Sequence, residues 1–514
     1  MLSLFLFLPL VVSSLNILLY SAPIGFSHIQ LMTSIADTLV EGGHNVTVLA
    51  PVVEAKMRKH VSKGASTIFV DMPEEIRQKQ AARTEGLWQL DAMFGNLIKV
   101  GGVGSIQMDV CKNLLERRGE YFHNLNTTFD VAIVDLNGLC GFGLIQLLDV
   151  RSTVAVSAIG FMDGVTEVFH TPVMHSYVPG QLLYYTDKMT FLQRMWNGAW
   201  HTFSRASYSL IFPWRYRQLF SFFGIEFDLL GSILPQINYL LINTDEYLDI
   251  GRPVSQRIKY IGGVAVKPPG RMPETFEKLL NSSRRGVIAI SFGSYATTSD
   301  MPRDMKEAFL LAIDELKEYD FVWRVDHRDM SLSDGRRNLH TVSWLPQREL
   351  LHHSTVKVFV SHAGMNSVLE TTQAGKPALF IPIFGDQFQN AATVSRKNTS
   401  KVIWKTELKG RAVVTALRDL LEDPGYSQRA ERLAQLMSSK SFSPKDRILE
   451  AVEYTGKFGR IHDLDVHGFS MGTIEYFNID VIIGWMFVFF CLFYSIHFLF
   501  YRTRVEVKEK YKFQ

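Results

Sequence analysis

Hydrophobic residues form long unbroken runs near the two ends of the 514-residue chain. Residues 1–14 are an apolar run closed by small residues, which is typical of a secretory signal peptide although a basic start is missing. A first buried strand is the alternative, but joined to the next apolar stretch it would exceed the usual strand length. Residues 481–501 contain one ionisable residue, His497, and are long enough to cross a bilayer. The two runs predict a single-pass type I membrane protein.

The tail, residues 502–514, carries five basic residues against two acidic ones. The positive-inside rule therefore places the tail in the cytosol and the body in a lumen. Lys510 and Lys512 have the spacing of a dilysine retrieval signal, which predicts the membrane of the endoplasmic reticulum. Basic residues that anchor a membrane helix explain the same pair equally well.

If the body is lumenal, N-x-S/T sequons are candidate glycosylation sites. Four occur, beginning at Asn45, Asn126, Asn281 and Asn398. Asn45 lies inside a predicted strand, so we expect burial to hide it. Asn281 and Asn398 lie in polar stretches and are the better candidates for glycosylation. Which of the four carry glycans is left open.

Between the ends, strand-like and helix-like segments alternate. Residues 15–23 and 44–51 predict two strands, and the segment between them has the apolar spacing of one helix face and stops at Gly42 and Gly43. The continuous apolar run at 129–135 is typical of a strand buried on both faces of a parallel sheet. This order predicts a βαβ opening of a parallel sheet.

Residues 263–273 are rich in Gly and Pro and break every periodic pattern, which predicts an interdomain linker. A second alternating series follows, with predicted strands at 286–294, 321–325, 356–362 and 377–383. We therefore predict an α/β fold with two Rossmann-like, doubly wound domains that face a cleft, plus one C-terminal transmembrane helix.

The predicted organisation has seven parts: a signal peptide (1–14), an N-terminal Rossmann-like domain expected to bind the acceptor substrate (15–262), the linker (263–273), a C-terminal Rossmann-like domain expected to bind a nucleotide-linked donor (274–440), a returning helix with a juxtamembrane segment (441–480), the membrane helix (481–501) and the basic tail (502–514). The aromatic-rich residues 161–227 are predicted to form helices and loops. They either line an apolar pocket or touch lipid.

Composition narrows the function classes. The chain is 47% hydrophobic and 20% charged, which excludes disorder. A net charge of +3 gives no basic field suited to nucleic acid. The three cysteines, Cys111, Cys140 and Cys491, are too few for a disulfide scaffold and form no zinc pattern, so neither redox chemistry nor a metal site is expected.

Most of the candidate functional residues cluster around His362, which ends a predicted strand. The next helix begins near Asn366, so its free N–H groups and positive dipole end face a spot suited to a diphosphate. His362, Asn366 and Ser367 add side-chain donors there. Glu370 lies one turn further on the same helix face, where a carboxylate can accept from two vicinal hydroxyls, as a ribose offers.

Further donors and acceptors flank this segment. Trp344 offers a flat face on which a uracil ring can stack, and Gln347 lies on the same loop. Asp386 and Gln387 follow the next strand, and a carboxylate beside an amide suits sugar hydroxyls. Ser294 ends a strand with a glycine turn, which predicts a second phosphate-contacting loop. Taken singly, each is an ordinary loop, core or surface residue, and the prediction rests on their joint spacing.

The N-terminal half contains a candidate base. His28 lies where the first strand passes into its helix, and a histidine titrates near neutral pH. Asp135 ends another strand of the same sheet and can bond to the far nitrogen of His28, which fixes its tautomer. Asp130 lies one strand length earlier and is predicted to be too far from the site.

Residues 344–390 closely resemble the nucleotide-sugar signature of the UDP-glycosyltransferases, the family that includes the UDP-glucuronosyltransferases. The order of the GFSH, FDxxxxD and SFGS motifs and of the membrane helix with its basic tail resembles that of animal members. The resemblance implies a GT-B fold, a UDP-sugar co-substrate, no metal or other cofactor, His28 as base and Asp135 as its partner. The implied donor-binding residues are Ser294, Trp344, Gln347, His362, Gly364, Asn366, Ser367, Glu370, Asp386 and Gln387.

The resemblance implies an inverting transfer of glucuronate or glucose from a UDP-sugar to a hydroxyl of a small lipophilic acceptor. One departure concerns the phosphate loop. Animal members usually have two glycines after the histidine, whereas this chain has Ala363 and Gly364, and Ser367 stands where many of them carry glycine. The pair Asn366 and Ser367 resembles the plant arrangement, so phosphate binding is expected while the effect of Ala363 on the donor pose is open.

A different class of function is the alternative: a non-catalytic, UDP-sugar-binding membrane subunit that pairs with a related transferase. The presence of both His28 and Asp135 argues against it. A glycoside hydrolase would need two carboxylates flanking the bond, and no convincing pair is found. A single span disfavours a transporter. The expected partners are the UDP-sugar, the acceptor and the membrane, without nucleic acid, and homo- or hetero-oligomers are left open.

Overall fold

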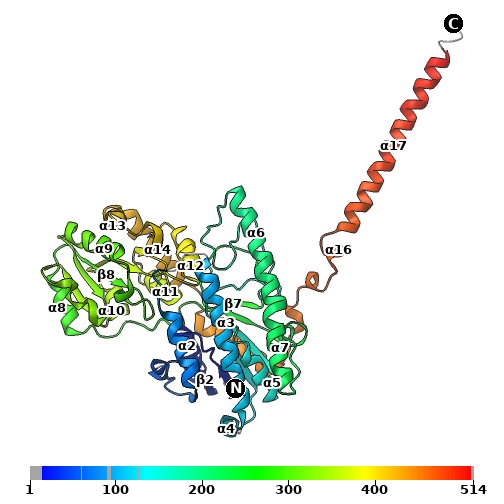
Figure 1. The fold of residues 1–514 in the computed structure, drawn as a ribbon. Coiled ribbons are helices and arrows are strands. Elements are labelled where there is room, and N and C mark those ends of the chain that lie inside the picture. Colours follow the sequence, from blue (N-terminus) through cyan, green and yellow to red (C-terminus); the bar gives the residue numbers. More distant parts are fainter. Residues whose placement is uncertain (1–13, 60, 90–93, 126, 511–514) are drawn as a thin grey trace, which may run out of the picture. The chain divides into compact units, whose positions relative to one another are not determined.

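The computed structural model describes residues 14–510 except residues 60, 90–93 and 126. The first thirteen residues of the predicted signal peptide and the sequon at Asn126 therefore lie outside the described residues. The chain divides into a body that ends at Ile461 and a second unit that begins at His462 (Figure 1).

The first sheet of the body has seven parallel strands in the order β3-β2-β1-β4-β5-β6-β7. Its strands are β1 (Asn16–Tyr20), β2 (Asn45–Val52), β3 (Ser66–Asp71), β4 (Val131–Asp135), β5 (Ser152–Ser157), β6 (Leu240–Ile242) and β7 (Ile258–Tyr260). Every residue of β4 is buried, as expected for an apolar run between two helix layers.

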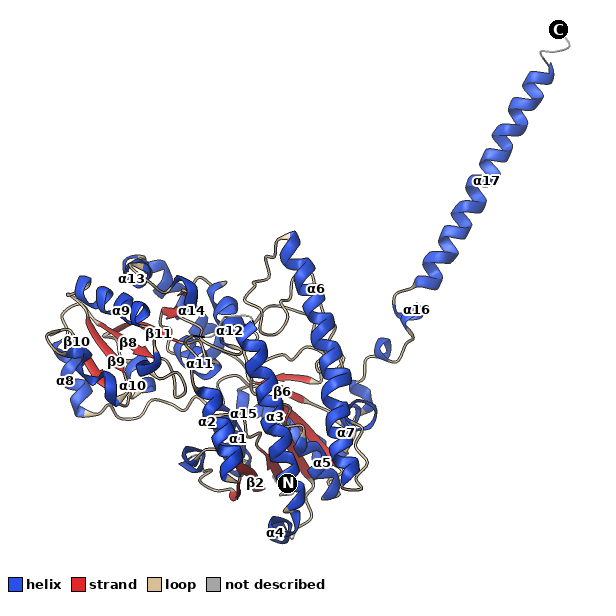
Figure 2. Cartoon of the chain, viewed as in Figure 1, coloured by secondary structure: helices blue, strands red, loops and turns tan. Residues whose placement is uncertain are grey.

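Helices cover both faces of this sheet (Figure 2). They are α1 (Phe26–Glu41), α2 (Glu74–Thr84), α3 (Phe94–Glu116), α4 (Arg118–Phe122), α5 (Cys140–Leu147), α6 (Phe191–Ala206), α7 (Phe212–Phe222) and, from the end of the body, α15 (Pro444–Phe458). The predicted apolar face of α1 is buried, and Gly43, with φ of +90°, ends the helix in a conformation that favours glycine. Within residues 161–227 the structure has two helices, α6 and α7, joined to loops.

The second sheet has six parallel strands in the order β10-β9-β8-β11-β12-β13. Its strands are β8 (Val287–Ser291), β9 (Asp320–Arg324), β10 (Leu339–Val342), β11 (Val356–Ser361), β12 (Ala378–Phe380) and β13 (Ser400–Val402). Its helices are α8 (Glu274–Ser282), α9 (Arg303–Glu315), α10 (Gln347–His352), α11 (Met365–Gln373), α12 (Gln387–Ser395), α13 (Ala412–Glu422) and α14 (Pro424–Ser438).

Both sheets have the doubly wound Rossmann order, so the predicted fold class is confirmed. The strand order reverses between β1 and β4 in the first sheet and between β8 and β11 in the second. Open parallel sheets bind ligands beyond the carboxyl ends of their strands at such points. His28 and Asp135 follow the first reversal, and Ser294 and His362 follow the second.

A tryptophan from the first half of the body packs into the hydrophobic core of the second half. Trp88, in the turn after α2, is 2% exposed and packs edge-on against Phe292 with ring centroids 5.1 Å apart. Its indole N–H donates to the carbonyl of Thr297 at 2.8 Å. The two halves of the body therefore share one packed core region.

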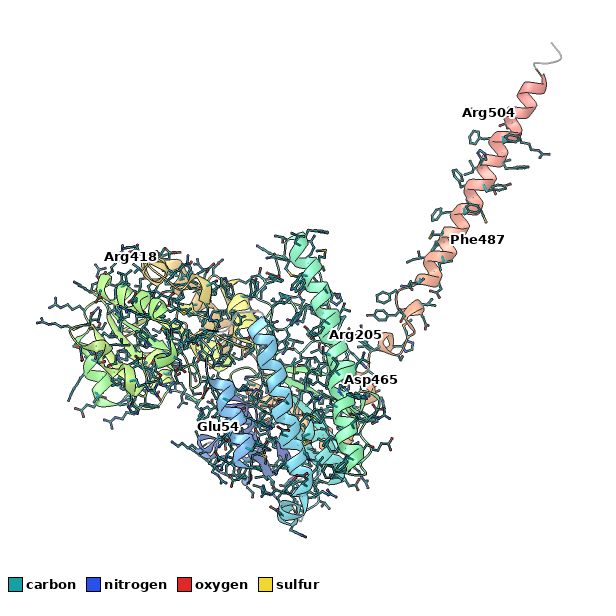
Figure 3. The ribbon with its side chains drawn as sticks, in the orientation of Figure 1. Glu54, Arg205, Arg418, Asp465, Phe487 and Arg504 are labelled. Carbon is teal, nitrogen blue, oxygen red and sulfur yellow. A yellow bond between two sulfur atoms is a disulfide. The ribbon has the colours of Figure 1, made fainter. Side chains whose placement is uncertain are left out.

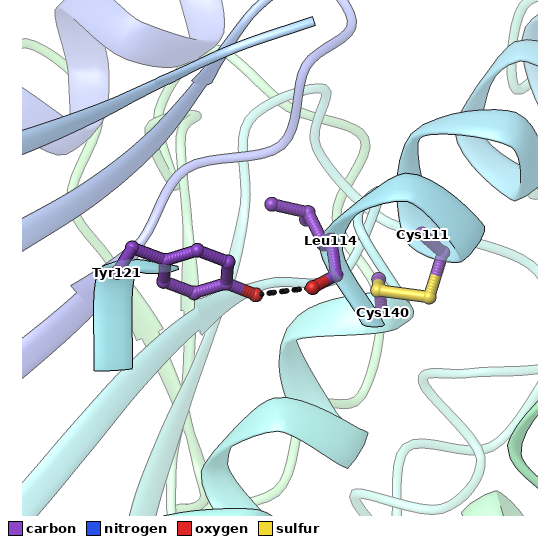
Figure 4. The surroundings of a disulfide bond; sticks show 4 residues. All are labelled: Cys111, Leu114, Tyr121 and Cys140. Atoms are coloured by element: carbon purple, nitrogen blue, oxygen red, sulfur yellow. Dashed lines mark hydrogen bonds between the residues drawn. A yellow bond between two sulfur atoms is a disulfide. The ribbon is translucent and has the colours of Figure 1, made fainter. Parts of the chain in front are cut away.

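A disulfide joins Cys111 of α3 to Cys140 of α5, with Cα atoms 5.5 Å apart (Figure 4). The cysteine count excluded a disulfide scaffold but did not reveal this single bridge. Nearby, the hydroxyl of Tyr121 donates to the carbonyl of Leu114 at 2.8 Å. The bridge thus ties α3 to α5, and this hydrogen bond ties α4 to the last turns of α3.

The expectation that Asn45 is buried is wrong. Asn45 begins β2, and its exposed side chain donates to the side-chain oxygen of Asn16 at 3.0 Å. The prediction failed because burial in β2 begins one residue after Asn45, at Val46. Asn281 and Asn398 are also exposed.

The second unit contains α16 (Thr473–Tyr476) and the long helix α17 (Ile479–Lys510). Among the described residues, α17 is the one helix long and apolar enough to cross a membrane, over the 26 residues Ile479–Arg504. Large side chains such as Phe487 project from it, and Arg504 stands near its basic end (Figure 3).

Candidate active site

His28 and Asp135 form a buried pair at the carboxyl ends of two neighbouring strands. β1 and β4 pair in parallel, and His28 follows β1 in the first turn of α1. Its Nδ1 lies 2.6 Å from Oδ2 of Asp135, and the residues are 5% and 0% exposed. The other carboxylate oxygen accepts from the backbone and side-chain N–H groups of Asn137 at 3.0 and 3.1 Å. A hydrogen bond donated by Nδ1 fixes the tautomer in which Nε2 can accept a proton.

Asp130 lies at the opposite end of the same strands. Its Oδ2 accepts from the backbone N–H of Asn16 at 2.7 Å, where β1 begins. Asp130 therefore holds the amino ends of two strands together and is remote from His28.

The loop between β11 and α11 is built tightly around His362. A Cβ atom at Gly293 would lie 2.7 Å from the imidazole, and one at Gly364 would lie 2.6 Å from it. Positions 293 and 364 therefore require glycine, because the backbone approaches the imidazole ring too closely for a Cβ atom. Burial and the charge of Arg324 lower the pKa of His362 to about 4, so the imidazole is neutral at physiological pH. It offers a hydrogen bond next to the α11 N-terminus without a formal charge.

Ala363, the residue that departs from the resembled motif, has a φ of +63°. This is the left-handed region, which favours glycine because a Cβ atom crowds the backbone there. The methyl group of Ala363 is fully buried in a core cluster, and its carbonyl accepts from Nδ2 of Asn390 at 3.1 Å. The strained backbone is thus held by packing and by a hydrogen bond.

Arg324 supplies a positive charge at this loop, and the sequence reasoning missed it. It ends β9, the neighbour of β8, and its Nη1 donates to the carbonyl of Gly293 at 2.6 Å. Burial lowers the pKa of the guanidinium, which nevertheless stays protonated in any accessible pH range. Its position at the carboxyl end of a strand beside the switch point is the signal that was available in the sequence.

Gln347, which begins α10, and Glu370, in the second turn of α11, form a pair. Nε2 of Gln347 donates to Oε2 of Glu370 at 2.5 Å and to the hydroxyl of Ser367 at 3.3 Å. Burial raises the pKa of Glu370, and the hydrogen bond from Gln347 opposes this rise. Trp344 lies just before α10 and is 62% exposed, so its indole face is open.

Asn366 bonds to the first half of the body. Its Nδ2 donates to Oε1 of Gln30 in α1 at 3.3 Å, and its Oδ1 accepts from Nδ2 of Asn243 after β6 at 3.4 Å. The side chain thus links α11 to the helix that carries His28.

Asp386 and Gln387 follow β12 at the start of α12, but they differ in role. Burial raises the pKa of Asp386, while its hydrogen bond from Asn390, at 2.7 Å, and the neighbouring His28 side chain oppose the rise. Asp386 therefore lies within electrostatic range of His28. The side-chain oxygen of Gln387 accepts from the backbone N–H groups of Ile383 and Phe384 at 2.9 and 3.1 Å. That oxygen shapes the loop, and sequence reasoning did not anticipate this use.

Residues 17–513 match the family described as "UDP-glucoronosyl and UDP-glucosyl transferase". The chain belongs to this family. Its members use a UDP-sugar as co-substrate without a metal cofactor. Within the described part of the chain, no group of three or more His, Cys, Asp or Glu residues is placed to hold a metal ion.

Relatives of this UDP-glycosyltransferase cover from about two thirds to almost all of the chain. A Caenorhabditis elegans protein named putative UDP-glucuronosyltransferase ugt-47 is 27% identical over 95% of this chain and 92% of its own length. A human protein named 2-hydroxyacylsphingosine 1-beta-galactosyltransferase is 29% identical over 69% of this chain and 64% of its own length.

Solved glycosyltransferase structures share the fold of this UDP-glycosyltransferase. Phytolacca americana UGT2, complexed with UDP-2fluoro-glucose and pterostilbene, superposes with a TM-score of 0.55, at 16% identity, over 86% of this chain and 100% of that one. CalG4, the calicheamicin glycosyltransferase, superposes with a TM-score of 0.57, at 15% identity, over 87% of this chain and 100% of that one. These likenesses establish the GT-B arrangement of two parallel sheets.

A pocket opens between the two halves of the UDP-glycosyltransferase body next to this site. Its lining includes Phe161 and Arg252 from the first half and Met365 and Asn390 from the second. Arg252 lies 4.1 Å above the ring of Phe161 and 3.3 Å from Oδ1 of Asp249. Arg252 precedes a proline in an irregular loop, far from the recognised motifs, so no sequence pattern marked it as a pocket residue.

Proposed function

We propose that this UDP-glycosyltransferase transfers glucuronate or glucose, with inversion, to a hydroxyl of a small lipophilic acceptor, and that His28 is its general base. The observation that carries the proposal is the 2.6 Å contact between Nδ1 of His28 and the buried carboxylate of Asp135. A histidine oriented by a carboxylate is the arrangement that removes a proton from a weakly acidic hydroxyl. A protein that only bound the UDP-sugar would have no use for it.

In the proposed reaction, Nε2 of His28 takes the acceptor's hydroxyl proton as the oxygen attacks the anomeric carbon. A bond forms between that oxygen and the carbon, and the bond from the carbon to the β-phosphate oxygen breaks on the opposite face. The configuration inverts, and the electron pair leaves with UDP. Asp135 stabilises the imidazolium that results.

The leaving diphosphate would meet the N-terminus of α11 and its neighbours. Backbone N–H groups at a helix start favour an anion, and Ser294, His362, Gly364, Asn366 and Ser367 surround that start in the proposal. Arg324 adds a fixed charge next to Gly293, 2.6 Å from its carbonyl. Such preorganised groups stabilise the charge that develops on UDP.

The nucleoside and sugar roles fall to the remaining residues. Trp344 is proposed to stack on uracil and Glu370 to accept from the two ribose hydroxyls, while Gln347 orients Glu370 through their 2.5 Å hydrogen bond. Asp386 is proposed to hold sugar hydroxyls near His28, and Gln387 to support it by fixing the loop.

Arg252 is the observation that favours glucuronate over glucose as the donor sugar. It lies in the pocket beside Asn390, which itself bonds to Asp386, and although it pairs with Asp249 at 3.3 Å its guanidinium has further N–H donors for a carboxylate on the sugar. Arg252→Ala is expected to raise the KM for UDP-glucuronate roughly 10- to 100-fold, the loss of one charged hydrogen bond, while sparing UDP-glucose. Arg337→Ala, on the exposed surface, is the matched control. Equal effects on both donors would assign Arg252 a structural role.

The membrane placement is part of the proposal. Helix α17 supports single-pass anchoring. The basic tail supports an orientation with the body on the lumenal side of the endoplasmic reticulum membrane. The human relative is named for a sphingosine acceptor, a lipid alcohol, which supports a lipophilic acceptor here.

UDP release from membranes that contain the protein tests the proposal. The assay supplies phenols and steroids with either UDP-glucuronate or UDP-glucose and compares the wild type with His28→Ala. We expect donor-selective release that His28→Ala abolishes and that His327→Ala, an exposed histidine, leaves unchanged. Thermal protection by UDP with no release from any pair would instead favour the non-catalytic subunit.

A further inference from the structure

Helices α6 and α7 form one long rod with an unusual distribution of side chains (Figure 2). With the π turn η3 (Ser207–Ile211) between them, they span residues 191–222, roughly 45 Å at 1.5 Å per residue. Most surface helices turn an apolar face inward and a polar face to solvent. In α6 the residues buried against the body are Asn197, Trp200, His201 and Ser204.

Hydrogen bonds hold this polar inner face. Oδ1 of Asn197 accepts from the N–H of Gly180 at 2.8 Å, and Nδ2 donates to the carbonyl of Val178 at 2.8 Å. The indole of Trp200 donates to the carbonyl of Gln181 at 2.6 Å. Helix α6 is thus fixed to the body mainly through hydrogen bonds, and its large aliphatic side chains are left for the other face, whereas α7 packs inward through Tyr216 and Phe220.

The opposite face carries a continuous apolar stripe. Its members, which we name the outer stripe, are 45% to 78% exposed. They are Leu192, Met195, Trp196, Phe203, Leu210, Ile211, Trp214 and Phe222. Of the nineteen large apolar side chains exposed on the described part of the body, nine belong to this one rod: the eight of the outer stripe and Phe191.

The π turn keeps the stripe on one side. A π turn adds one residue and so rotates the following helix face by about 100°. After it, Tyr216 and Phe220 point inward, and Trp214 and Phe222 point outward. Without the extra residue, the outward face of α7 would not continue that of α6.

The charge of the rod indicates what covers the stripe. Residues 191–222 contain four arginines, at 194, 205, 215 and 217, and no Asp or Glu. Arg205 pairs with Glu167 of a neighbouring loop at 3.0 Å, and the segment is still positive. A helix with Trp, Phe and Leu on one face and arginines along it has the composition of helices that lie in a membrane interface. A second copy docked through the same stripe would bring together two rods that carry arginines and no acidic residue.

We propose that the outer stripe docks the body onto a lipid bilayer, with the arginines contacting anionic headgroups. This inference rests on the proposed membrane anchoring by α17. The segment 462–478 between the body and α17 spans at most about 60 Å when extended, so membrane insertion of α17 would tether the end of the body, Ile461, within about that distance of the bilayer. Docking would bring the acceptor-binding half of the body to the surface in which lipophilic acceptors concentrate.

Environment-sensitive labels on the full-length protein in vesicles test the docking. In a Cys491→Ser background, Met195→Cys carries the label on the stripe, and Arg303→Cys, whose side chain is 92% exposed, is the control on the second half. The vesicles contain phosphatidylcholine with or without phosphatidylserine. We expect the Met195 label to emit at shorter wavelength, to resist iodide and to be quenched by nitroxide lipids, most strongly with phosphatidylserine, while the Arg303 label stays open to iodide.

The other outcomes each overturn part of the proposal. Equal iodide quenching at the two positions excludes docking. Protection from iodide without quenching by nitroxide lipids indicates a protein partner, such as a second copy. Equal protection in both vesicle types removes the role of the arginines. If iodide quenched a label on Cys491, α17 would not span the membrane. UDP release in detergent tests the transferase activity separately.

Discussion

The hydroxyl of Tyr295 accepts a hydrogen bond from the backbone N–H of Phe26 at 3.1 Å, so a residue of the second half caps the helix that carries His28. Gly25, the N-cap of α1, has no side chain to do this. The same hydroxyl donates to Oε1 of Glu54 at 3.0 Å. Burial and the charge of Glu54 raise the pKa of Tyr295 well above its usual range, so the phenol stays protonated.

Tyr295→Phe is expected to lower kcat roughly two- to tenfold, which corresponds to one net hydrogen bond, with little change in the donor KM. Tyr295 immediately follows Ser294, the predicted phosphate contact, so it links the donor loop to the base helix. Loss of the hydroxyl loosens the start of α1 while the ring keeps its packing. Steady-state kinetics with both substrates varied measure kcat and the donor KM separately.

Tyr454→Phe, at a half-exposed tyrosine of α15, is the control for removing a phenol hydroxyl. If Tyr295→Phe raised only the donor KM, the hydroxyl would act on donor binding and not on the position of His28. If both variants behaved like the wild type, the interdomain cap would have no part in catalysis.

Asp135→Asn should reduce kcat about 100- to 10,000-fold while the fold is kept. The asparagine fills the same space, but its amide N–H can point at Nδ1 of His28 and so favour the tautomer in which Nε2 carries the proton and cannot accept one. Asp130→Asn, on the same strand but at the amino end, should retain normal turnover, because an asparagine oxygen still accepts from Asn16. Matching melting temperatures would show that the loss is chemical, and equal turnover in the two variants would remove Asp135 from the mechanism.

The pH dependence of donor binding should follow Glu370. Burial raises the pKa of this carboxyl, so as pH falls through the raised value it gains a proton and loses acceptor capacity for the ribose hydroxyls. The KM for the UDP-sugar should therefore rise on the acid side, by roughly tenfold if two hydrogen bonds weaken. Glu370→Gln should have the raised KM at every pH, and Glu277→Gln, on exposed α8, should keep the wild-type profile. An acid rise that persists in Glu370→Gln would assign it to another group.

The approach of His28 to Asp135 was predictable because carboxyl ends of neighbouring parallel strands meet at one sheet edge. The same rule brought His362 and Ser294 to the second switch point. Apolar periodicity also predicted α1 and β4, since both are buried in the way that their patterns require.

The contacts that were not predicted join segments that are distant in the sequence. A local sequence pattern does not say which distant segments pack together. The disulfide between Cys111 and Cys140 depends on how α3 packs on α5, and the cap that Tyr295 provides depends on how two halves dock. Gln387 resembles a sugar ligand in sequence, yet its oxygen serves the backbone of its own loop. Asn45 was misjudged because a strand pattern says which residues alternate but not where burial begins.

Ala363→Gly should change the free energy of unfolding by less than about 1 kcal/mol, although it deletes a fully buried methyl group. A left-handed alanine costs roughly 1–2 kcal/mol, and glycine at φ of +63° removes that strain. Loss of the buried methyl, about 0.8 kcal/mol, and the greater unfolded-state entropy of glycine, about 0.4–1 kcal/mol, offset the gain.

Ala391→Gly is the matched comparison, because Ala391 is also fully buried in the same core cluster but lies in the regular helix α12. There the lost methyl and the helix propensity of glycine act in the same direction, so about 2 kcal/mol should be lost. Denaturant unfolding of both variants against the wild type measures the difference. A loss at Ala363 as large as that at Ala391 would mean that its backbone is not strained, and that the alanine in the phosphate loop stabilises the fold.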